Sequence, residues 1–171
     1  MKKIFIQRKH SVAKTYYFVF SDLDGSNEQN VVLDASSYQD KEFLYYSLST
    51  NNLVDDQPDK NNWHLWFTKY YDPEVGNQLV TGVLLNPSVK AMRLDGVLPS
   101  ETDTTMGVFS SNPGVIGYDW KQLDHNTFTY VVPDDITFFV KTADKELYKI
   151  HFTRFEGSST GKVVFVKEKV D

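Results

Sequence analysis

The chain has 171 residues, 40% of them hydrophobic and 15% aromatic, and a formal net charge of −5. A chain of this length buries enough surface to fold without a disulfide or a structural metal, and the absence of cysteine excludes disulfides, thiolate catalysis and cysteine-ligated metals. The acidic balance argues against nucleic acid as a partner, because phosphate binding needs a basic surface.

The first ten residues, MKKIFIQRKH, are basic with a short apolar centre. The apolar run covers only residues 4–6, which is too short for the core of a signal peptide. No segment has the length that an apolar helix needs to cross a bilayer. If the protein is exported, we expect its signal to lie outside this sequence.

Strand patterning recurs along the chain. Apolar and polar residues alternate in eight segments, which are separated by turn-forming Asp, Asn, Gly and Pro. The segments are residues 15–21, 30–34, 43–48, 63–71, 127–132, 136–142, 147–155 and 162–170. Aromatic and β-branched residues favour pleated surfaces, so we predict an all-β single domain of antiparallel hairpins.

The last three segments are joined by short loops, which predicts an antiparallel meander. In LYKIHFTRF (147–155), Tyr148, Ile150, Phe152 and Arg154 share one face because side chains alternate along a strand. We predict that this is the inner face of the sheet.

Residues 72–126 differ from the rest in being rich in Gly, Pro, Asn, Ser and Thr. We predict long loops in this middle part of the chain. Binding groups are commonly carried by loops on a rigid scaffold, so we expect a ligand site here.

The common enzyme fingerprints are absent: there is no phosphate-binding glycine loop, no nucleophile elbow and no zinc-binding helix motif. The histidines, His10, His64, His125 and His151, fall on different predicted elements. A three-histidine metal site would need distant loops to converge. We therefore expect a binding protein rather than an enzyme.

Three blocks of sequence together resemble the HmuY family, haem-capturing surface lipoproteins of the Bacteroidetes. The blocks are VVLDASSYQDKEFLYYSL (31–48), NNWHLWFTKYY (61–71) and YVVPDDITFFVKTADKELYKIHFTRF (130–155). The resemblance implies an all-β, HmuY-like domain over residues 30–171. Residues 1–29 have no counterpart in it, and we expect them to add edge strands as an N-terminal extension.

The resemblance also implies a function. HmuY-like proteins hold haem through paired axial ligands drawn from His or Met. The protein would then be an extracellular or outer-membrane haem carrier, attached through a lipid anchor absent from this chain. It would take haem from a host haem carrier and deliver it to an outer-membrane receptor.

The ligand set follows from position in the resemblance. His125 occupies the place of one axial ligand, after Tyr118-Asp119-Trp120 and before the closing hairpin, and Asp124 is a candidate to orient its ring. Met106 is the candidate for the other ligand, with Met92 in reserve. Trp120, with Val108, Phe109 and Ile116, would wall the haem, and Arg93, Lys90 and Lys121 would meet its propionates.

Other interpretations stay open. His125 is also explained as a loop histidine in contact with solvent, and Trp120 as a core ring of the sheet. In an alternative interpretation, the family's middle loop is shortened here and the same β scaffold has lost the haem site. In that alternative the protein is a surface module that binds a glycan or a host protein.

Overall fold

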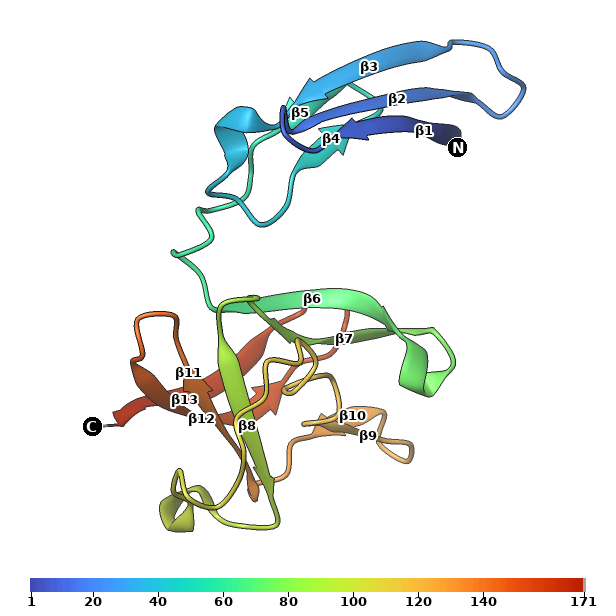
Figure 1. Cartoon of the computed structure of the whole chain (residues 1–171). Helices are drawn as coiled ribbons and strands as arrows, with labels where there is room; N and C mark the ends of the chain where they lie inside the picture. The colour runs from blue at the N-terminus through green and yellow to red at the C-terminus, as the bar shows by residue number, and fades with distance from the viewer. Residues whose placement is uncertain (171) are drawn as a thin grey trace. The chain divides into compact units, whose positions relative to one another are not determined.

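The computed structural model describes residues 1–170, and it confirms the all-β prediction. Clustering of contacts divides the chain into two compact units, Met1–Asn62 and Trp63–Asp171 (Figure 1). The sequence pattern predicts one domain, and the contacts of the chain gather in these two units. Within residues 1–170, no helix combines the length and the apolar character that a membrane crossing requires.

The N-terminal unit is built on a three-stranded antiparallel sheet of order β1-β2-β3. Its elements are β1 (Lys2–His10), β2 (Thr15–Asp22), β3 (Gln29–Asp34), the 3-10 turn η1 (Ser36–Tyr38), β4 (Tyr45–Ser47) and β5 (Asn52–Val54). Strands β4 and β5 form a separate hairpin. Buried Phe18, Phe20 and Val31 make a small core with Tyr46 and Leu48.

The sequence predicts a boundary between residues 29 and 30. That position falls inside this sheet. Strand β2 pairs with β3 from Thr15↔Asp34 to Phe20↔Gln29. The backbone hydrogen bonds of this ladder join the two sides of the expected boundary. The division of the chain lies instead after Asn62.

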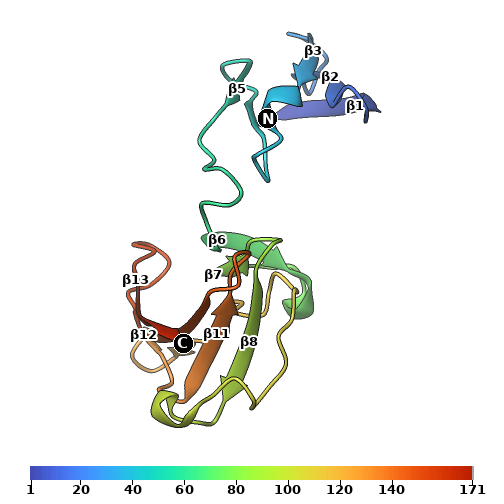
Figure 2. The ribbon, with the colours of Figure 1, turned by 60° about the vertical axis from the view of Figure 1, so that its left-hand side comes forward.

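The C-terminal unit contains a four-stranded antiparallel sheet of order β13-β12-β11-β8 and two further hairpins, β6-β7 and β9-β10 (Figure 2). Its strands are β6 (Leu65–Asp72), β7 (Gln78–Leu85), β8 (Lys90–Asp95), β9 (Gln122–Asp124), β10 (Thr129–Val131), β11 (Ile136–Lys141), β12 (Leu147–Phe155) and β13 (Val163–Val170). Short 3-10 turns occur at η2 (Pro73–Val75) and η3 (Pro99–Glu101). The predicted closing meander corresponds to β11, β12 and β13.

The main core lies on one face of the four-stranded sheet. Phe138, Ile150 and Phe152 are each at most 3% exposed there, and they pack with Val83 and Leu85 of β7. The inner face predicted for β12 is therefore correct at Ile150 and Phe152. At Arg154 it is wrong: a shift in the β12–β13 register follows Phe152, and Phe155 is buried in place of Arg154.

The opposite face of the sheet carries a second, smaller core. Met92, Leu94 and Phe139 are buried there, with Phe109 packed against them. The main-core face and this second-core face are called the inner and outer face below.

The middle of the chain, residues 72–126, supplies three strands, β7, β8 and β9, as well as the predicted loops.

Two glycines hold the segment before β9 against β7. Val83 and Gly117 exchange backbone hydrogen bonds of 2.8 and 3.1 Å. A Cβ atom on Gly82 would lie 2.5 Å from the Gly117 oxygen, so only glycine permits this approach. Gly117 itself has a φ of 66°. The contact fixes where residues 118–121 enter the core.

Candidate functional site

His125 lies in the tight loop that joins β9 to β10 (Figure 1). The Phe128 N–H donates to the Asp124 carbonyl oxygen over 2.8 Å. The Asp124 carboxylate accepts from the Asn126 N–H over 2.8 Å and from the Thr127 hydroxyl over 2.9 Å. These bonds hold the pKa of Asp124 below its ordinary value. Asp124 thus braces the loop backbone, and in the described part of the chain its carboxylate makes no hydrogen bond to the His125 ring.

The loop presents two side chains to solvent. His125 is exposed, and Phe128 is 78% exposed. Phe128 also has a φ of 53°, in the left-handed region that bulky residues rarely adopt. Strained backbone of this kind persists only where the surroundings enforce it, and it often marks functional sites.

The base of the hairpin is anchored in the inner core. The rings of Tyr130 and Phe155 meet edge to face with centroids 4.7 Å apart. Leu123 and Val131, at the same hairpin, are 38% and 54% exposed. The hairpin therefore offers an accessible imidazole and several apolar side chains on an anchored support.

Trp120 is a core residue of the inner face. It is 1% exposed, and its ring stacks on Phe152 with centroids 4.2 Å apart and meets Phe155 edge on. Ile116, also expected as a wall, is completely buried. In this arrangement neither side chain is open to a bound ligand.

The two methionines belong to the outer face. Met92 is 1% exposed, and its sulfur lies 2.8 Å from the position that a Cβ on Gly107 would take. Met106, next to this glycine, is 49% exposed. The loop of His125 belongs to a hairpin anchored on the inner face, whereas Met106 precedes a residue packed on the outer face. The structure thus divides the predicted ligands between two faces and does not bring them together.

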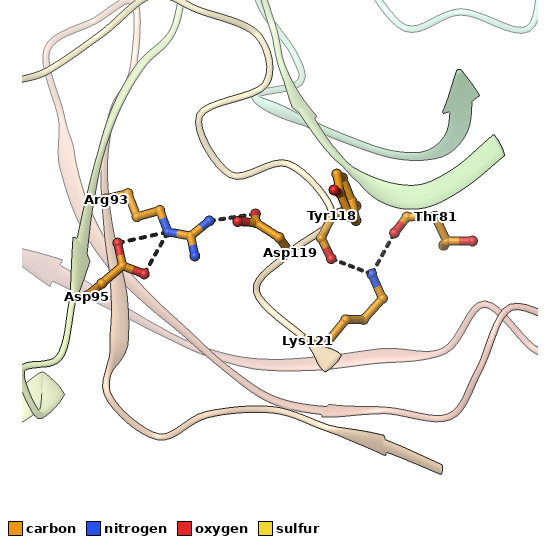
Figure 3. Close-up of polar contacts among 6 residues, drawn as sticks. All are labelled: Thr81, Arg93, Asp95, Tyr118, Asp119 and Lys121. Atoms are coloured by element: carbon orange, nitrogen blue, oxygen red, sulfur yellow. Dashed lines mark hydrogen bonds and ion pairs between the residues drawn. The ribbon is translucent and has the colours of Figure 1, made fainter. Parts of the chain in front are cut away.

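Arg93 and Lys121 do approach a common region, an open depression of about 470 Å³. Its lining includes Asp95, Tyr118 and Asp119 (Figure 3). Arg93 donates to Asp119 over 2.6 Å and to Asp95 over 2.9 Å. Because both carboxylates already neutralise the guanidinium, this cluster offers little to a further anion.

Lys121 is committed to the backbone. Its ammonium donates to the Thr81 carbonyl over 2.6 Å and to the Tyr118 carbonyl over 2.9 Å (Figure 3). It also lies 4.5 Å from the centroid of the Trp120 ring. Burial lowers the pKa of Lys121 to about 8, and nearby Asp119 opposes the shift. The lysine therefore ties β7 to the segment before β9.

Within residues 1–170, no group of three or more His, Asp or Glu side chains is placed to hold a metal ion. A haem differs from a bare ion because its porphyrin supplies four ligands, so a single accessible imidazole is sufficient for attachment. The exposed ring of His125 meets that requirement, and Phe128 in the same loop is an exposed apolar side chain. A two-sided clamp of His125 and Met106 does not fit this arrangement.

Comparison of the chain with protein-family models, with curated proteins and with solved structures gave no match.

Proposed function

We propose that the protein binds haem on the β9–β10 hairpin, with His125 as the iron ligand and Phe128 as an apolar support for the porphyrin. The observation that carries the proposal is the pairing of an accessible imidazole with an exposed, backbone-strained phenylalanine in one braced loop. The resemblance to haem-capturing lipoproteins motivates the choice of ligand. The protein would act as a carrier, without catalysis.

The proposed site is one-sided, which sets its affinity. Typical ligand pockets enclose most of the ligand surface, whereas a hairpin tip covers one face only. We expect binding in the micromolar range, on the order of 8 kcal/mol. A haem held from one face remains open to a second protein, which suits a carrier that passes its cargo to a receptor.

The test is titration of the protein with haemin, followed in the Soret region. We expect a shifted, saturable band in the natural chain and loss of that band in His125→Ala. His10→Ala is the matched control, because His10 is also exposed but lies in the N-terminal unit. The proposal fails if His125→Ala retains the band, or if both variants weaken it equally.

A further inference from the structure

Strand β1 leaves one side of its backbone without a partner strand. It is nine residues long and lies at the edge of the sheet, where it pairs with β2 alone among the described strands. Long edge strands invite pairing with other chains, and proteins usually shorten or cover them. This edge belongs to the N-terminal unit, apart from the hairpin proposed for haem.

The centre of β1 is apolar and bare on both faces. Ile4 and Ile6 pair with Phe20 and Phe18, so they share the face of the small core. Those phenylalanines are 2% and 8% exposed, but Ile4 and Ile6 are 52% and 63% exposed. On the opposite face, Phe5 is 69% exposed. The core face therefore continues onto β1 without a cover.

Basic residues flank this apolar centre in a chain whose net charge is −5. They are Lys3, Arg8, Lys9 and His10, together with Lys2, which is ion-paired with Asp22 over 2.8 Å. Arg8 and Lys9 lie over the rings of Tyr17 and Tyr16, at 4.2 and 5.3 Å from the centroids. Neither has an ion pair with a carboxylate in the part of the chain that the structure describes.

A groove of about 660 Å³ runs beside β1 on the core face. Its lining combines the β1 residues Ile6 and Lys9 with Tyr16 and Phe18 of β2 and with residues 38–39 and 41–44. A strand added to the free edge would place alternate side chains next to Ile6 and Lys9, at this groove. The groove therefore offers a partner further apolar and basic side chains next to the edge strand.

The charge pattern argues against a second copy of the chain as the occupant. An antiparallel β1–β1 pair centred on Ile6 sets Lys3 opposite Lys9 and Lys2 opposite His10. Like charges directly opposite one another destabilise a sheet.

We propose that β1 binds an extended segment of another protein as an additional strand, and that this segment carries about three apolar residues bracketed by acidic residues. Backbone hydrogen bonds along the free edge would supply affinity. The apolar residues would cover Ile4, Phe5 and Ile6, and the acidic residues would meet the basic flanks. This partner site is independent of haem binding.

The experiment uses the full chain and a fluorescent peptide, Glu-Glu-Glu-Thr-Val-Phe-Val-Glu-Asp, with anisotropy as the readout. We expect saturable binding that weakens with added salt, and no binding of a peptide with lysine in place of the acidic residues. Ile6→Asp should weaken binding at least about tenfold. Val12→Asp should not, because Val12 is 91% exposed in the turn after β1.

A second variant guards against misfolding as the explanation. In Arg8→Glu/Lys9→Glu, the acidic peptide should be lost and the lysine peptide gained, which an unfolded protein would not do. The proposal is overturned if Ile6→Asp binds the acidic peptide as the natural chain does. It is also overturned if the chain ignores both peptides and instead self-associates through β1, or binds only anionic lipid vesicles.

Discussion

Replacement of Phe128 by glycine separates a binding role of this side chain from a structural one. At a φ of 53°, a non-glycine residue carries a strain of roughly 1–2 kcal/mol that glycine relieves. Glycine costs about 0.5–1 kcal/mol through the greater freedom of the unfolded chain. The ring is 78% exposed, so its loss removes about 1 kcal/mol of burial at most. These contributions nearly cancel, and Phe128→Gly should change the free energy of unfolding by less than about 1 kcal/mol.

Haem affinity should respond differently. If the Phe128 ring supports the porphyrin, its removal should raise the dissociation constant about tenfold, which corresponds to about 1.4 kcal/mol. Urea unfolding measures the stability, and haemin titration of the same samples measures the affinity. The reasoning is refuted if Phe128→Gly loses as much free energy of unfolding as a core variant such as Trp120→Ala. It is also refuted if the haemin affinity of Phe128→Gly equals that of the natural chain.

The remaining predictions concern the inner core. Trp120→Ala removes a buried ring stacked on Phe152, and urea unfolding should show a loss of about 3–5 kcal/mol; a loss below about 1 kcal/mol would place Trp120 outside the core. Lys121 has a folded pKa of about 8 against an ordinary value of 10.5, so between these values the unfolded chain binds more protons. The free energy of unfolding should therefore rise with pH across this window, by at most about 3 kcal/mol. In Lys121→Met this contribution should disappear. If the free energies of unfolding of the natural chain and of Lys121→Met change in parallel from pH 8 to 10, the lowered pKa of Lys121 is contradicted.

Within the closing meander, β12 was predictable because its burial alternates from Lys149 to Phe152. Strand β12 buries Ile150 and Phe152 and leaves the intervening His151 partly exposed. One buried and one accessible face produce the period of two that the sequence displays. The turn at Asp124 was not predicted, although aspartate is a residue type whose side chain commonly bonds to nearby backbone, as it does here.

Strand β8 was not predicted, because its centre is covered on both faces. Ala91 faces the inner core, whereas the neighbouring Met92 faces the outer one, and both are buried. Such a strand shows no alternation. Gly82 within β7 also suggested a loop, although it is there to admit Gly117 at close range.

The burial of Trp120 and Met92 could not be predicted from the sequence. Whether Trp120 forms a wall or a core ring depends on its contact with Phe152, which lies far away along the chain. The left-handed backbone of Phe128 was also missed, since an aromatic residue gives no signal for that conformation. Only its place after a run of turn-forming residues offered a hint.

Chemical rescue tests ligation by His125 most directly. The variant His125→Gly removes the imidazole from an exposed loop position, so small molecules have access to the vacated place. With haemin present, added imidazole should restore the Soret band of the natural chain, and it should do so at concentrations that leave free haemin unchanged. If His125→Gly shows the natural spectrum without imidazole, or if imidazole acts equally on free haemin and on the variant, His125 is not the iron ligand.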